Sequence, residues 1–118
     1  MNKDKLESYL SGKKGADGTY PFGPEALVFK VMGKMFALVI QGETPPRVNL
    51  KVVPEDGAIL TGRFDAISPG YHMNKRHWIT ITLDGTVPDE MIIDLVGDSY
   101  NLVVAKLKKA DKEKLDRL

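Results

Sequence analysis

The chain has 118 residues, of which 42% are hydrophobic and 28% charged, and its net charge is +1. This length suits one domain with a hydrophobic core, so we expect a single domain over residues 1–118. The near balance of 17 basic and 16 acidic residues excludes a strongly basic nucleic-acid-binding protein, so any polyanion must bind a local patch. The chain has no cysteine, which excludes disulfides, thiolate metal ligands and thiol nucleophiles.

The N-terminal residues are charged rather than apolar, and the longest apolar run covers only residues 35–40. A signal peptide needs a longer apolar stretch, and a membrane-spanning helix needs about 20 apolar residues. We therefore expect a cytoplasmic protein that does not enter a membrane. We also expect it to be a monomer.

The first half of the chain predicts one helix and three strands. Leu6 and Leu10 lie four residues apart in a polar segment, which predicts a short helix ending near Gly12, followed by a glycine-rich loop to residue 20. Residues 26–32 and 35–41 are β-prone, and Gly33-Lys34 between them predicts a hairpin turn. Residues 47–52 alternate strictly between polar and apolar side chains, which predicts a strand with one wet face.

The second half predicts two helices and one more strand. Proline and acidic residues open a helix over residues 54–64 and another over residues 88–107. Residues 67–76 show no periodicity and predict a loop, and residues 77–83 alternate as a strand. The charged tail after Lys108 either extends the last helix or frays. The predicted class is α+β, with an antiparallel sheet, helices packed on one of its faces, and the order α-β-β-β-α-β-α.

Alternation also assigns the predicted strands two faces. Val48, Leu50 and Val52 point to the core, as do Leu27, Phe29 and Val31, and Ile79, Ile81 and Leu83. The opposite face is then open to solvent and collects Lys30, Arg47, Asn49, Lys51, Trp78, Thr80 and Thr82. Cations interleaved with an aromatic side chain suit nucleic acid, but exposed polar alternation is also the ordinary appearance of an antiparallel sheet.

The common catalytic and metal-binding motifs are missing. His72 and His77 are the only histidines, and no nearby acid has a metal-ligand spacing, so we expect no metal site. There is no Gly-x-Ser-x-Gly elbow and no phosphate-binding glycine motif, so we expect no catalytic residues, no cofactor and no enzymatic activity.

Residues 69–78, Pro-Gly-Tyr-His-Met-Asn-Lys-Arg-His-Trp, form an unusual motif, and Leu83-Asp84-Gly85 follow it. With Tyr20-Pro21-Phe22-Gly23 and Ser99-Tyr100, this motif resembles the MmcQ/YjbR family of small bacterial proteins from about residue 20 to residue 107. The resemblance implies a frataxin-like α+β fold, also described as a double wing. It also implies DNA binding, a label that rests largely on fold.

Two functions remain open after this comparison. The first is weak, largely sequence-independent DNA binding by the open face and the motif. The second is a protein- or small-anion-binding module on the same face. An iron-handling role fits poorly because Lys3, Lys5 and Lys30 stand where carboxylates would be needed. The predicted binding residues are Lys30, Arg47, Asn49, Lys51, Tyr71, His72, Asn74, Lys75, Arg76, His77 and Trp78.

Overall fold

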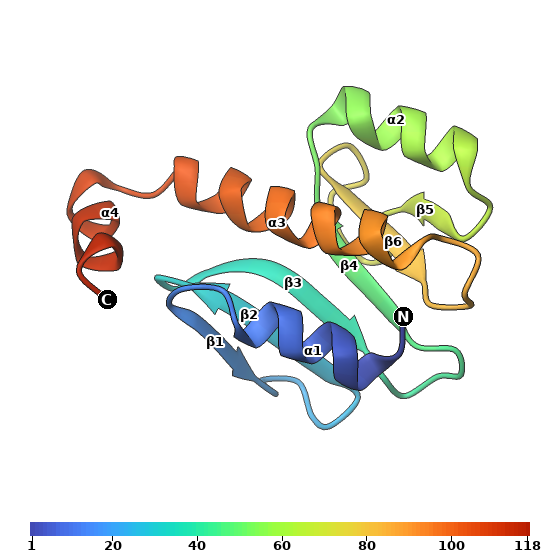
Figure 1. Cartoon of the computed structure of the whole chain (residues 1–118), viewed down its shortest axis with the longest axis horizontal. Helices are drawn as coiled ribbons and strands as arrows, with labels where there is room; N and C mark the ends of the chain where they lie inside the picture. The colour runs from blue at the N-terminus through green and yellow to red at the C-terminus, as the bar shows by residue number, and fades with distance from the viewer.

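The computed structural model describes all 118 residues as four helices and six strands (Figure 1). In chain order these are α1 (Lys3–Ser11), β1 (Ala16–Thr19), β2 (Ala26–Val31), β3 (Lys34–Ile40), β4 (Arg47–Lys51), α2 (Pro54–Arg63), β5 (Ile67–Pro69), β6 (Trp78–Thr82), α3 (Asp89–Ala105) and α4 (Lys109–Asp116). The strands form one antiparallel sheet in the order β1-β2-β3-β4-β6-β5. The predicted α+β class and antiparallel sheet are confirmed.

One connection skips a place in the sheet, and it positions the motif of residues 69–78. After β4, helix α2 carries the chain to the far edge, where β5 lies, and β6 then returns to fill the place between them. Residues 70–77 therefore connect the two outermost strands at this edge, with α2 beside them.

The β2–β3 hairpin is confirmed, although its turn lies one residue earlier than predicted. Met32 and Gly33 occupy the turn with φ values of 49° and 79°, and Lys34 already belongs to β3. Two consecutive positive φ values are typical of the hairpin turns that match the twist of paired strands. Glycine fits the second position because it adopts positive φ without steric cost.

Two edge strands were predicted as loops. β1 contains Asp17 and Gly18 and has no apolar alternation, because it lies at the sheet edge and pairs only with β2. β5 has three residues and ends in Pro69, which lacks an N–H but is tolerated on an edge strand. Neither strand has the composition from which a strand is normally predicted.

The charged tail neither extends the last helix nor frays. It turns after α3 and forms the separate helix α4, whose Leu115 is buried. A Cβ added at Gly15 would lie 2.6 Å from a Leu115 methyl group, and Gly15 has a φ of +73°. Glycine is thus required where the C-terminal helix packs onto the β1 end of the sheet (Figure 1).

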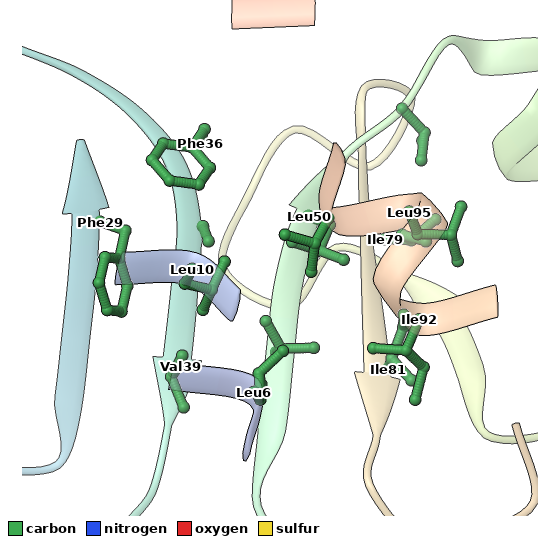
Figure 2. Packing of buried hydrophobic residues seen from close by; sticks show 14 of the residues in the cluster. Leu6, Leu10, Phe29, Phe36, Val39, Leu50, Ile79, Ile81, Ile92 and Leu95 are labelled. Carbon is green, nitrogen blue, oxygen red and sulfur yellow. The ribbon is translucent and has the colours of Figure 1, made fainter. Parts of the chain in front are cut away.

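The hydrophobic core lies between the helices and one face of the sheet (Figure 2). Leu6 and Leu10 of α1 and Ile92 and Leu95 of α3 contribute the helix side of this core. The sheet side includes Phe29, Phe36, Val39, Leu50, Ile79 and Ile81. Each such side chain stabilises the fold by about 1.5–3 kcal/mol when fully buried. The predicted inward-facing residues of β2, β4 and β6 are confirmed.

A buried serine joins the two halves of the sheet. Ala37 and Leu50 form the last register pair between β3 and β4. Beyond this pair the Ser99 hydroxyl of α3 donates to the Phe36 carbonyl at 2.6 Å and accepts from the Lys51 N–H at 2.8 Å. The hydroxyl therefore replaces a direct backbone hydrogen bond where the two strands separate.

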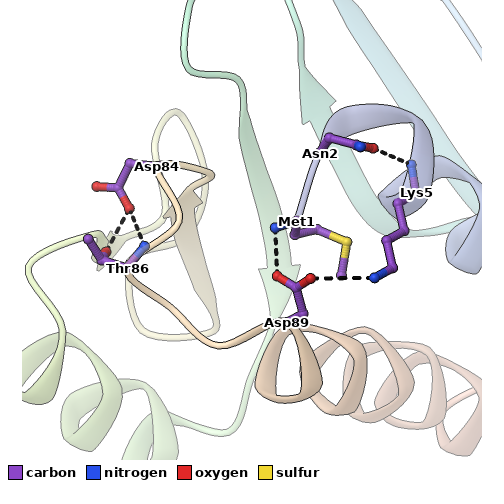
Figure 3. Close-up of polar contacts among 6 residues, drawn as sticks. All are labelled: Met1, Asn2, Lys5, Asp84, Thr86 and Asp89. Carbon is purple, nitrogen blue, oxygen red and sulfur yellow. Dashed lines mark hydrogen bonds and ion pairs between the residues drawn. The ribbon is translucent and has the colours of Figure 1, made fainter.

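Two aspartates order the chain at the N-terminal end of α3 (Figure 3). Asp89 accepts from the Met1 amino group at 2.6 Å and from Lys5 Nζ at 3.4 Å, and the hydrogen bond from the amino group is the main cause of its lowered pKa. Asp84 accepts from the Thr86 hydroxyl at 2.6 Å and from the Thr86 N–H at 3.0 Å, which lowers the pKa of Asp84. These contacts tie α1 to α3 and shape the turn between β6 and α3.

None of the helices combines the length and the apolar character that crossing a bilayer requires.

Candidate functional site

The candidate site is built around residues 70–77, which we call the edge loop. Its first half folds over the face of the sheet opposite the helices. Tyr71 N–H donates to Thr80 Oγ1 at 2.8 Å, Thr80 Oγ1 donates to Asn49 Oδ1 at 2.6 Å, and Asn49 Nδ2 donates to the Tyr71 carbonyl at 3.1 Å. Asn49 and Thr80 stand directly opposite each other on β4 and β6. We call this closed ring of three hydrogen bonds the latch.

The prediction of an open sheet face is wrong at β4 and β6. Asn49 is 0% exposed, Thr80 1% and Trp78 9%, because the edge loop covers this part of the face. Gly70 N–H donates to the Trp78 carbonyl at 2.8 Å, and a Cβ at Gly70 would lie 2.7 Å from the Trp78 Cβ. Asn49 and Trp78 therefore hold the loop in place and are not available to a ligand in this conformation.

An aromatic pair backed by a cation lies on the outer surface of the latch. The Arg47 guanidinium lies 4.4 Å from the centroid of the Tyr71 ring, and the His72 ring centroid lies 4.0 Å from that of Tyr71 at an interplanar angle of 50°. Tyr71 remains 42% exposed and His72 is also exposed. Arg47 forms an ion pair of 3.0 Å with Glu43, which partly neutralises its charge. Its Nε is buried without a hydrogen-bond partner.

The second half of the edge loop turns to the side of the sheet that carries α2. Asn74 Oδ1 accepts from the Arg76 N–H at 3.0 Å and so fixes the local turn. Lys75 Nζ donates to the Gly70 carbonyl at 3.1 Å, whereas the Arg76 guanidinium has no partner in the protein. Lys75 and Arg76 line a hollow together with residues of α2. The loop thus wraps around the edge of the sheet.

Two other predicted residues, Lys30 and His77, lie apart from these two groups. Lys30 stands opposite Asp17 of β1, and β3 separates its strand from β4. His77 is half-buried and its carbonyl accepts from the Val52 N–H at 2.9 Å. The structure does not assemble the continuous basic face that the alternation predicted.

Lys51 is partly withdrawn from solvent. Its Nζ lies 6.0 Å from the centroid of the Trp78 ring. Burial, and secondarily the charge of Lys106, lower the pKa of Lys51. This side chain is therefore less accessible to a ligand than an exposed lysine.

Several residues of the site were missed by the sequence analysis. Thr80 was assigned to the exposed face, but its hydroxyl is the centre of the latch. Pro54, Gly57, Ala58 and Thr61 line the hollow from α2. Their spacing of three and four residues is a usable signal, because it places small side chains on one helix face.

No three histidine or carboxylate side chains in the chain come together in a way that could hold a metal ion. His72 packs against Tyr71, and the side chain of His77 has no hydrogen-bond partner among the protein groups.

Comparison with known sequences identifies relatives of the whole chain. The family model YjbR matches residues 11–102. Protein YbdF of Escherichia coli O157:H7 is 41% identical over 96 residues, covering 81% of this chain and 79% of its own. Protein YjbR of Escherichia coli K12 is 35% identical over 118 residues and covers all of both chains.

Solved structures share the fold. The crystal structure of Deinococcus radiodurans protein DR2400 has a TM-score of 0.89 at 43% identity, covering 98% of this chain and 88% of that one. A crystal structure of a Pseudomonas syringae protein has a TM-score of 0.76 at 31% identity, and the match covers 86% of this chain and 98% of that one. These similarities agree with the resemblance that residues 69–78 indicate, and the chain belongs to the YjbR family.

Proposed function

We propose that this protein is a non-enzymatic binding protein that binds nucleic acid weakly, with little dependence on base sequence, through the edge loop and Arg47. One observation carries the proposal: the edge loop combines the exposed Tyr71–His72 pair with two cations, Lys75 and Arg76, that form no ion pair within the protein. The four ion pairs of the chain join Met1 and Lys5 to Asp89, Lys3 to Glu7, and Arg47 to Glu43. Unpaired cations are free to contact phosphates and release their counterions.

The latch supports this proposal because it orders the loop before any ligand arrives. Binding by a disordered loop would cost the conformational entropy of fixing its backbone and side chains. Here hydrogen bonds to the buried Asn49 and Thr80 already fix the backbone of Tyr71. The exposed side chains that follow Tyr71 are thus presented in a defined arrangement.

The exposed Tyr71–His72 pair favours single strands over duplex. Unpaired bases can stack on aromatic rings, whereas the bases of a duplex are already stacked. Neither α2 nor α3 offers a basic N-terminal turn to the major groove, because the first turns of both helices are acidic. A single strand that crosses the sheet edge could contact the rings on one side and the loop cations on the other.

The structure lowers the number of phosphate contacts that we expect. An open face would have offered Arg47, Lys51, Lys75 and Arg76. Because Lys51 is partly buried, about three cations remain, one of them shared with Glu43. Three contacts correspond to a log–log salt slope of about −2 for single strands and about −3 for duplex.

The test is a backbone-amide NMR titration with oligothymidylate of about ten nucleotides, the size range of one single-strand site, and with a duplex of the same length. At low salt we expect shifts in residues 70–77 and at Arg47, larger for the single strand and lost as salt rises. Tyr71→Ser and Arg76→Gln should each weaken them, whereas Ile59→Ser on the exposed side of α2 should not. Absence of shifts at low salt, or equal shifts in Arg76→Gln, would contradict the proposal.

A further inference from the structure

A hollow of about 300 Å³ lies between α2 and the edge loop, on the side of the sheet away from Tyr71 and Arg47. Figure 1 shows α2 running beside β5 and the loop that leads into β6. The hollow is lined by Pro54, Gly57, Ala58, Thr61, Pro69, Lys75, Arg76 and Ile79. We call it the α2 cleft. Its volume is at the lower end of the range of small-molecule sites, about 300–1,000 Å³.

The charged residues that line the α2 cleft are all basic. Two cations, Lys75 and Arg76, contribute to its lining, and no carboxylate does. Lys75 uses one of its three N–H donors on the Gly70 carbonyl. The Arg76 guanidinium keeps all five of its N–H donors, since it has no partner in the protein. The cleft therefore offers several charged donors and no acceptor of opposite charge.

The helix geometry explains why the acids of α2 stay out of the cleft. Successive residues of a helix are rotated by about 100°, so Glu55 and Asp56 point away from the face shared by Pro54, Ala58 and Thr61. The remaining walls are small or apolar, with Ile79 at the base. Gly57 packs closely against the sheet, because an added Cβ would lie 3.0 Å from a Val52 methyl group.

We propose that the α2 cleft binds a small organic anion, a single phosphate or carboxylate group carried on a short apolar body. Arg76 and Lys75 bind the anionic group, because guanidinium and ammonium form charge-assisted hydrogen bonds with such oxygens. The walls formed by Pro54, Ala58 and Ile79 contact the apolar body. This site is distinct from the aromatic surface at Tyr71, although a nucleic-acid phosphate presents the same chemistry to the two cations.

The test uses phenyl phosphate as the anionic probe and phenol as its neutral counterpart, titrated into labelled protein and followed by amide NMR. We expect saturable shifts at Gly57, Ala58, Thr61 and Arg76 with phenyl phosphate, and at least tenfold weaker binding of phenol. Ala58→Glu places a carboxylate in the cleft beside the cations and should abolish the shifts. Its matched control Ile59→Glu adds the same charge to the exposed side of α2, where Ile59 is 66% exposed, and should leave them unchanged.

Measurements on two further variants separate this proposal from nucleic-acid binding. Arg76→Gln should weaken phenyl phosphate at least tenfold, and Tyr71→Ser should leave it unaffected while weakening oligothymidylate. The proposal is overturned if phenyl phosphate causes no saturable shift, if phenol binds equally well, or if Ala58→Glu and Ile59→Glu behave alike. If the protein binds oligothymidylate but not phenyl phosphate, the proposed anion site in the α2 cleft is wrong and the proposed nucleic-acid binding stands. If it binds phenyl phosphate but not oligothymidylate, the proposed nucleic-acid binding is wrong and the anion site stands.

Discussion

Replacing Thr80 by valine should loosen the edge loop, because valine has the shape of threonine without its hydroxyl. The substitution removes two hydrogen bonds of 2.8 and 2.6 Å and leaves the Tyr71 N–H and Asn49 Oδ1 without partners. An unsatisfied buried group costs about 1–3 kcal/mol. Because two such groups are left, one of them only partly buried, we expect the free energy of unfolding to fall by about 3 kcal/mol. This is a large fraction of the ~5–15 kcal/mol by which domains are usually stable.

Thr80→Ser is the matched control, since it keeps the hydroxyl and removes one methyl group at a cost of about 1 kcal/mol. Urea unfolding measures the two free energies, and amide hydrogen exchange at Tyr71 reports the loop directly. We expect Thr80→Val to be the more destabilised by about 2 kcal/mol and to lose protection at Tyr71. Equal stabilities of the two variants, or unchanged exchange at Tyr71, would refute the latch.

Three further predictions test other parts of the fold. Gly70→Ala should destabilise the protein by about 1–3 kcal/mol in urea unfolding, because the added Cβ would lie 2.7 Å from the Trp78 Cβ. Gly62→Ala on α2, where the added Cβ has open space around it, should stabilise the protein by about 0.5–1 kcal/mol. The opposite order of the two stabilities would contradict the loop packing. Ser99→Ala should cost about 1–3 kcal/mol in the same assay, because two backbone groups lose their shared partner; a neutral result would show that β3 and β4 can rejoin directly. The pKa of Lys51 is lowered in the folded state, so the unfolded chain binds more protons and the free energy of unfolding rises with pH between that lowered pKa and the ordinary value of 10.5. Lys106→Ala should raise the pKa of Lys51 in a side-chain NMR titration and reduce this rise, and an unchanged pKa would show that burial alone lowers it.

The sequence predicted the parts of the fold that follow a strong periodic pattern. The strict alternation around Val48 and Leu50 and the stripe of apolar residues in α3 both gave the correct element and the correct buried face. β1 and β5 were missed because they are edge strands, whose pairing comes from the neighbouring strand rather than from their own composition. Their backbone conformation is set by tertiary contacts that a local pattern does not contain.

The candidate site was predicted less completely, for a related reason. Alternation correctly placed Asn49, Trp78 and Thr80 on the face away from the core, but it does not tell what covers that face. Polar side chains at Asn49 and Thr80 indicated solvent, whereas the structure uses them to satisfy the backbone of the loop. The motif of residues 69–78 did identify the correct segment. Its division between two sides of the sheet edge depends on the path of the loop, which only the structure shows.

The most direct test of the central claim, that the unpaired cations of the edge loop bind a nucleic-acid strand, is the salt dependence of oligothymidylate affinity for the native chain and for Arg76→Gln. We predict a log–log slope of about −2 for the native chain, reduced in magnitude by about 0.7 in Arg76→Gln as one phosphate contact is lost. Ile59→Ser should keep the native slope. A slope that is the same in all three proteins, or no measurable binding at low salt, would contradict the account.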